Sequence, residues 1–184
     1  MNGSDFLFSL YSLLLGLAVA HVATGFADSW VERRKTTLGA TTLLLALLIL
    51  LRAAGQWTSF WSSRAGLTMD PALVLTALGV ALPYVFIGRI AFPRPGHGGR
   101  NTDDHYMDNR TALMAALSIS PCVSLASNLG NLGTSPVQLL WATLKFVLPL
   151  AIPLALGFST SQRLHRLGLG VLVACTFLLL LQSS

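Results

Sequence analysis

The sequence predicts an all-α fold: an integral membrane bundle of about six transmembrane helices. The chain of 184 residues is 53% hydrophobic and only 10% charged, whereas an average soluble domain has about 25% charged residues. Its mean hydropathy is +0.66, and its hydrophobic residues are gathered into long runs. We therefore expect residues 1–184 to form one transmembrane domain whose partners include membrane lipids. The net charge of +5 falls mainly near the expected loops, so it does not indicate a nucleic-acid partner.

Six runs are long enough, or nearly so, to span a membrane, because about 20 helical residues cross about 30 Å of hydrocarbon. The expected spans are residues 6–27, 38–61, 71–92, 111–129, 136–158 and 167–182. The last of these is the shortest. The first is expected to be retained, because residues 1–5 include Asp5 and no Lys or Arg, whereas a secretory signal peptide begins with positive charge.

The positive charges predict the topology. The first, third and fifth loops contain or adjoin most of them, namely Arg33, Arg34, Lys35, Arg89, Arg94, Arg100, Arg110, Arg163 and Arg166. By the positive-inside rule these loops, including residues 93–110, are expected in the cytoplasm, with both termini on the outer, periplasmic side of a bacterial inner membrane. Interfacial aromatic residues agree with this topology, with Trp57, Trp61 and Trp141 expected at the outer interface and Trp30 and Tyr106 at the inner one.

Proline and small residues predict how the helices bend and pack. Four prolines lie inside expected spans: Pro83, Pro121, Pro149 and Pro153. Each should kink its helix and free the carbonyl oxygen four residues earlier, because proline has no backbone N–H. The segments Gly16-x-x-x-Ala20 and Ala77-x-x-x-Ala81 have the small-residue spacing that allows close helix contact. Such contacts would serve packing within the chain or between copies in a homo-oligomer.

Two basic residues lie deep within the hydrophobic runs. At about 1.5 Å of helical rise per residue, Arg52 is expected roughly 12 to 14 Å below the outer boundary, and Lys145 roughly 13 Å below it. The two cations should therefore lie at one level, although they belong to different spans. A charged group in the bilayer core costs about 2.5 to 3.5 kcal/mol on insertion scales, so it should face the protein interior, water or a headgroup.

Several polar side chains are expected at a similar depth. Ser120, Ser124 and Ser127 follow the spacing of one helix face, and Gln56 lies one turn above Arg52. No Asp or Glu lies within the core of any span to neutralise the two cations. An anion between them, such as a phosphate, carboxylate or halide, would relieve their repulsion. The alternative is that both basic side chains extend to the outer headgroups.

His21 is the other unusual residue of the spans. It lies in the first span, roughly 10 Å from the inner end by the same helical rise. An intramembrane histidine can relay protons or ligate a haem or metal. A histidine that has no second histidine in any expected span is more often hydrogen-bonded to a neighbouring helix. No second haem ligand is evident, so the cofactor, if any, stays unassigned.

The loop 93–110 is expected to contain a short helix. Asn101 or Thr102 can cap its start. Asp104, His105 and Asp108 have spacings that place them on one face, so a metal site of carboxylates and imidazole is geometrically feasible. A solvated helix at the membrane interface is the simpler interpretation, because acidic residues interact favourably with a helix N-terminus.

The sequence lacks the motifs of several common enzyme classes: His-Glu-x-x-His, Gly-x-Ser-x-Gly, the P-loop and paired carboxylates within the spans. It therefore favours a role other than catalysis. The leading hypothesis is a small channel or transporter whose outward-facing basic cluster binds an anionic solute or a lipid headgroup. Two alternatives stay open: an accessory or structural subunit that binds a protein partner or lipid, and a haem, quinone or proton-relay protein centred on His21.

Overall fold

The computed structural model describes residues 3–32, 34, 37–63, 70–93, 101–131 and 135–182. Within these residues it contains helices and no strand. The helices that could span a membrane are α1 (Gly3–Val31), α2 (Ala40–Ser63), α3 (Pro71–Ile90), α5 (Arg110–Asn128), α8 (Gln162–Gln182) and a composite fifth span. That span joins α6 (Pro136–Ala142), the π-helical segment Thr143–Val147 and α7 (Leu148–Gly157). The predicted all-α bundle with six spans is thus confirmed, while the orientation of its termini stays a prediction.

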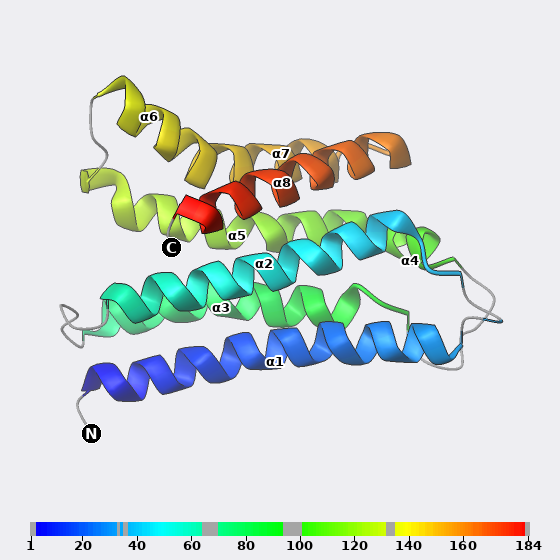
Figure 1. Cartoon of the computed structure of the whole chain (residues 1–184), viewed down its shortest axis with the longest axis horizontal. Helices are drawn as coiled ribbons and strands as arrows, with labels where there is room; N and C mark the ends of the chain where they lie inside the picture. The colour runs from blue at the N-terminus through cyan, green and yellow to red at the C-terminus, as the bar shows by residue number, and fades with distance from the viewer. Residues whose placement is uncertain are drawn as a thin grey trace.

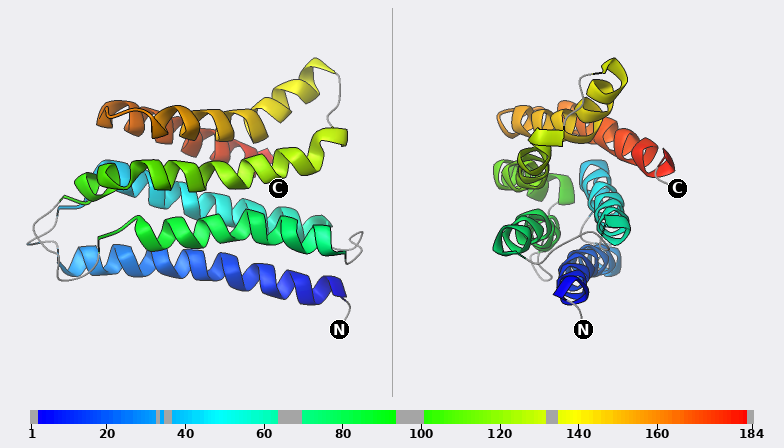
Figure 2. Two further views of the ribbon diagram at one scale, coloured as in Figure 1. Left: turned by 180° about the vertical axis from the view of Figure 1, so that it is seen from behind. Right: turned by 90° about the vertical axis from the view of Figure 1, so that its left-hand side faces the viewer.

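The six spans form a ring in which each packs against two neighbours. The order around the ring is α1, α3, α5, α7, α8 and α2, and α2 packs again on α1 (Figure 2). Both chain termini lie toward one end of the bundle, which we call the termini end (Figure 1). The short helix α4 (Thr102–Asp108) lies at the opposite end, which we call the α4 end.

The inner faces of the helices form an apolar core. Its largest fully buried side chains come from five of the spans and from α4: Leu7, Leu45, Leu48, Ile49, Tyr84, Ile87, Tyr106, Leu113, Met114, Leu117, Leu169 and Leu172. The outer faces carry exposed leucine, valine and phenylalanine side chains, as expected for helices that face acyl chains. The ring is therefore apolar on both faces, and its polar side chains are confined to a few places.

Small residues set how closely the helices pack. A Cβ atom added to Gly88 of α3 would lie 2.9 Å from the Ala18 carbonyl oxygen of α1, so this contact needs glycine. Ala77 and Ala81 are buried, as their spacing predicts. Gly16 and Ala20, in contrast, are exposed, and Gly16 has no atom of another helix near its Cβ position. This second pair does not serve packing within the chain.

The helix α4 packs between α2 and α5 and closes the ring at the α4 end (Figure 2). Asn101 caps it by accepting a hydrogen bond from the Asp103 N–H at 3.1 Å, as predicted. Thr102, Asp103 and Tyr106 face inward and are buried. The Tyr106 hydroxyl finds a partner inside the protein at the α4 end, and its depth relative to the membrane interface stays a prediction. Residues 94–100 of the same loop lie outside the described residues.

The last span is longer than its apolar run predicts. It begins at Gln162 rather than at residue 167, so its first turn contains His165 and Arg166. Periodicity of apolar residues does not detect this turn, because most of its side chains are polar. Gln162, His165 and Arg166 contact α4, and His165 is fully buried, whereas Leu164 is exposed.

Candidate anion-binding site

Two cavities occupy the half of the ring nearest the termini end. The central cavity, about 410 Å³, lies among α1, α2, α3, α5 and the π-helical segment, and its lining includes Tyr11, Arg52, Gln56, Ser59, Thr76, Ser124, Ser127, Asn128 and Lys145. The α8-side cavity, about 330 Å³, lies among α2, α7 and α8, and its lining includes Arg52, Gln56, Ser59, Ser62, Lys145, Pro149, Thr176, Leu179 and Leu180. Four residues line both cavities: Arg52, Gln56, Ser59 and Lys145. The structure thus brings together the two cations that the depth count places at one level.

Arg52 is buried without a partner. Its side chain is only 9% exposed, and its Nε atom has no hydrogen-bond partner. No ion pair or hydrogen bond joins Arg52 to any other residue in the described part of the chain. A buried guanidinium is costly unless it is paired and hydrogen-bonded. This side chain is therefore the strongest indication of an anionic ligand.

Lys145 lies in the middle of the π-helical segment Thr143–Val147. The π turn follows from Pro149, which has no N–H to donate to the Lys145 carbonyl oxygen. The Leu148 N–H instead donates to the carbonyl oxygen of Thr143, five residues earlier. The Lys145 side chain is exposed, and its Nζ atom lies 5.5 Å from the ring centre of Phe146. A π turn often occurs at functional sites, because it shifts the direction of its side chains relative to a regular helix.

Further polar groups of α2 continue the site toward the termini end. Arg52, Gln56, Ser59 and Ser63 follow i, i+4, i+7 and i+11 spacing, so they share one helix face. The Tyr11 hydroxyl donates to Gln56 Oε1 at 3.3 Å, which holds the amide in place. The Nε2 donors of Gln56 have no partner among the described residues, so they can serve an anion together with Arg52. The sequence analysis missed Tyr11 and Ser59, although the spacing of Ser59 signals its place on this face.

The serine stripe of α5 is only partly at the site. Ser124 and Ser127 line the central cavity. Ser120 lines neither cavity, because it is 1% exposed and forms a hydrogen bond of 3.0 Å with the Tyr84 hydroxyl. Helical spacing correctly places the three serines on one side of α5, but it does not reveal that the hydroxyl of Ser120 is hydrogen-bonded to Tyr84 of α3.

A second polar cluster, which the sequence analysis did not identify, lies at the α4 end. The buried Asp103 carboxylate accepts hydrogen bonds from the Thr42 N–H at 3.0 Å, the Thr41 hydroxyl at 3.0 Å and Gln162 Nε2 at 2.9 Å. Arg166 Nη2 also donates to it at 3.1 Å and completes an ion pair. Burial acts to raise the pKa of Asp103, but the hydrogen bonds from Thr42, Thr41 and Arg166 outweigh it and hold the pKa below its usual value. The carboxylate thus ties α4 to the first turns of α2 and α8.

Tyr106 and His165 form the other half of this cluster. The Tyr106 hydroxyl lies 2.7 Å from His165 Nδ1, and His165 Nε2 lies 3.1 Å from the Ser159 carbonyl oxygen. Because a carbonyl oxygen only accepts, Nε2 carries the proton and Nδ1 accepts from Tyr106 when the imidazole is neutral. Burial, and to a lesser degree the charge of Asp103, raises the pKa of Tyr106 and keeps this hydroxyl protonated.

The three residues considered for a metal site lie on α4 but do not converge. Asp104 and Asp108 are exposed, while the His105 Nε2 atom lies 3.0 Å from the Ile90 carbonyl oxygen and donates to it. Within the part of the chain that the structure describes, no three His, Cys, Asp or Glu side chains are grouped to hold a metal ion.

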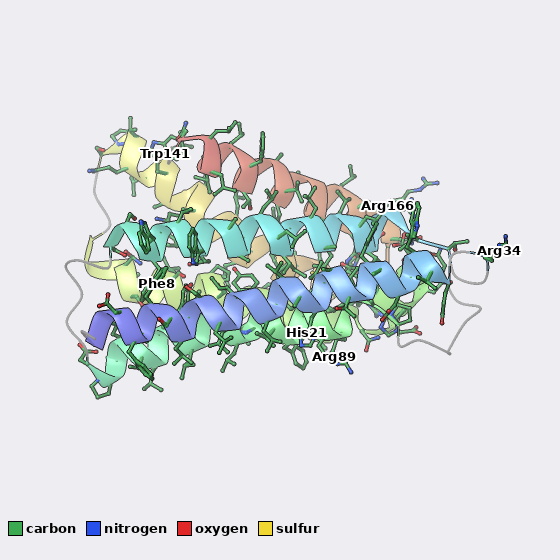
Figure 3. All side chains as sticks on the ribbon, turned by 60° about the horizontal axis from the view of Figure 1, so that its bottom comes forward. Phe8, His21, Arg34, Arg89, Trp141 and Arg166 are labelled. Atoms are coloured by element: carbon green, nitrogen blue, oxygen red, sulfur yellow. The ribbon has the colours of Figure 1, made fainter. Side chains whose placement is uncertain are left out.

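His21 lies at the contact of α1 with α3 and lines neither of the two cavities. A Cβ atom on Gly88 would lie 3.3 Å from the His21 Cβ atom. His21 appears beside Arg89 on one side of the bundle (Figure 3). It is half-buried and forms no hydrogen bond with another described residue.

Comparison with protein-family models, with curated protein sequences and with solved structures gives no significant match to this chain. The candidate site therefore stands on its own geometry: two cavities that share Arg52 and Lys145, at the termini end of a six-helix ring.

Proposed function

We propose that the protein is a small membrane transporter that binds an anionic species between Arg52 and Lys145. The observation that carries the proposal is the buried Arg52 guanidinium, which has no carboxylate and no hydrogen-bond acceptor among the described residues. An anion would satisfy this guanidinium and reduce its repulsion with Lys145 across the shared wall of the two cavities. Gln56 and Ser59 supply neutral donors on the same helix face.

The one-sided position of the cavities favours a transporter over an open channel. Both cavities lie toward the termini end, whereas α4 fills the ring at the opposite end. Fully buried side chains such as Leu48, Leu113 and Leu117 occupy the ring between them. A transporter that alternates access would hold its ligand near the membrane midplane and open to one side at a time. Release toward the α4 end would require α4 to move.

We infer that the α4 end faces the cytoplasm of a bacterial inner membrane. Most of the described basic residues lie at this end, including Arg34 and Arg166 (Figure 3). Trp141 and Phe8 lie at the termini end (Figure 3). Trp57 and Trp61 are exposed, and their rings lie 6.0 and 5.1 Å from the ring of Phe8. The positive-inside rule then places the cavities on the outer side. Cysteine labelling of variants at the exposed residues Ser62 and Ser161 in intact cells would test this orientation.

Anion flux through reconstituted liposomes tests the proposal. The wild-type protein and the variant Arg52→Leu/Lys145→Leu would be compared for uptake of phosphate, acetate and chloride as separate radiolabelled probes. We expect wild-type uptake of at least one probe, and a loss of at least about tenfold in the double variant, because a charge-assisted hydrogen bond contributes about 1.5 to 3 kcal/mol.

The matched control is Arg89→Leu, which makes the same chemical change at an exposed arginine outside both cavities. Its flux should equal that of the wild type. Equal uptake by wild type and double variant would reject anion transport at this site, and uptake of no probe by the wild-type protein would exclude these three free anions as its substrates.

A further inference from the structure

The α8-side cavity lies at the base of a wedge between two helices. From the π-helical segment onward, α6 and the C-terminal half of α8 diverge toward the termini end (Figures 1 and 2). α6 contains no buried residue, and the buried residues of α8 end at Leu172. The only helical segment that α6 contacts closely among the described residues is the adjoining π-helical segment. The wedge is thus open along its sides.

This cavity is lined by a mixture of basic, polar and apolar side chains, and its hydroxyl groups come from Thr58, Ser59, Ser62 and Thr176. Arg52, Gln56 and Lys145 supply basic and amide groups where the cavity meets the central one. Leu179 of α8 and Pro149 of α7 supply apolar walls. The central cavity has a similar mixture of polar and apolar side chains, but it lies among α1, α2, α3 and α5 rather than against α8.

Cations and apolar side chains in one cavity, beside an open wedge, suit an amphiphile better than a small hydrated ion. A free inorganic anion gains most from donors on all sides, and apolar walls offer it nothing in return for its lost hydration. A lipid with an anionic headgroup gains from both kinds of wall, because its acyl chain stays in an apolar medium while the headgroup meets the cations. The exposed position of Lys145 places one cation where a headgroup entering from the bilayer would meet it.

We propose that the ligand is a lipid with a phosphate headgroup, which enters sideways from the membrane between α6 and α8. The phosphate binds between Arg52 and Lys145, and the acyl chain lies along Leu179 in the α8-side cavity and leaves through the wedge. This inference rests on the proposed function, since it assigns the chemical class of the anion that the same two cations bind.

Binding measurements with two matched probes test the inference. Glycerol 3-phosphate and a short-chain lysophosphatidic acid below its critical micelle concentration share a phosphate headgroup, but only the second has an acyl chain. Titration calorimetry on the purified protein in detergent would give both affinities. We expect the lysophosphatidic acid to bind at least about tenfold more tightly, because each CH₂ group of its acyl chain that is buried in the cavity strengthens binding.

Two variants of α8 separate the chain from the headgroup. Leu179→Gln places an amide in the apolar wall and should reduce the affinity for lysophosphatidic acid while leaving that for glycerol 3-phosphate unchanged. Leu178→Gln is the control, because Leu178 is exposed and lines neither cavity. Lys145→Leu should lower the affinity for both probes, and Lys145→Arg should retain it. Because Lys145 is exposed, these substitutions leave the core intact.

The outcomes distinguish the two proposals. Equal affinity for both probes, with both lost in Lys145→Leu, would overturn the lipid inference and leave an anion site. An equal effect of Leu178→Gln and Leu179→Gln would also overturn it. If the affinity for neither probe changes when Lys145 or Arg52 is replaced by leucine, the anion site itself is rejected together with the inference.

Discussion

The two ends of the ring each bury a charged side chain, but only one of the two charges has hydrogen-bond partners among the described residues. At the α4 end, Asp103 is fully buried and accepts hydrogen bonds from α2 and α8, including the ion pair with Arg166. At the termini end, Arg52 is almost as deeply buried and has no partner among the described residues. The first charge is paired within the fold, and the second is not.

This difference indicates different roles. A paired and hydrogen-bonded charge ties segments together, because removing either partner leaves the other uncompensated. An unpaired buried charge destabilises the folded state, so its presence is best explained by a ligand that pairs with it. The hydrogen bonds of Asp103 thus hold the α4 end closed, whereas the unpaired Arg52 is the residue at which we propose that a ligand binds. Substitutions at the two charges should therefore have opposite effects on stability.

The largest effect is expected for Asp103→Ala. The substitution leaves the Thr42 N–H and the hydroxyl of Thr41 without their acceptor, and it breaks the ion pair with Arg166. We expect the free energy of unfolding to fall by about 2 to 4 kcal/mol, below the upper limit for a buried pair because Arg166 is 46% exposed and can be rehydrated. Thermal or SDS-induced unfolding in detergent micelles would measure the change.

Asp104→Ala is the control for that measurement. Asp104 is the next residue of the same helix and is exposed, so its loss should change the free energy of unfolding by no more than about 0.5 kcal/mol. Similar losses in the two variants would contradict the assignment of Asp103 as the residue that holds the α4 end closed.

A smaller effect is expected from acid. Because the folded state lowers the pKa of Asp103, its carboxylate stabilises the fold above the unfolded pKa of about 4, and this contribution is lost as the pH falls through the lowered pKa. The wild-type protein should therefore lose stability below about pH 4. Asp103→Asn should lose less over the same range, which unfolding measured from pH 7 to pH 3 would reveal. Parallel curves would show that Asp103 does not cause the acid sensitivity.

The sequence predicts the bundle well, because hydropathy and helix length are local properties. Each expected span corresponds to a helical span in the structure, with ends that lie a few residues earlier or later: α2 begins at Ala40 rather than at residue 38, and α8 at Gln162 rather than at residue 167. It also predicts that Arg52 and Lys145 lie at a similar depth, because depth in a membrane follows from counting residues along a helix. That both residues line the same cavities depends on which helices are neighbours.

The α4 end could not be predicted in the same way. Asp103 meets Thr42 and Gln162 across about sixty residues of sequence on either side, and no periodicity connects these positions. Its sequence context, an acidic residue in the first turn of a short helix, is also typical of a solvated N-terminus. Likewise, Ser120 differs from Ser124 only because Tyr84 of the neighbouring helix reaches it. Such pairings depend on which helices pack together.

The smallest change in stability is expected for Arg52→Leu, and its sign distinguishes the two ends. Leucine removes a buried charge that has no partner among the described residues, so without ligand the free energy of unfolding should stay the same or rise by up to about 1 kcal/mol. Unfolding in ligand-free detergent, under the conditions used for Asp103→Ala, measures it. A loss as large as that of Asp103→Ala would mean that Arg52 supports the fold. A stable variant that no longer binds anions would mean that the cost of burying Arg52 is offset only when the ligand is bound.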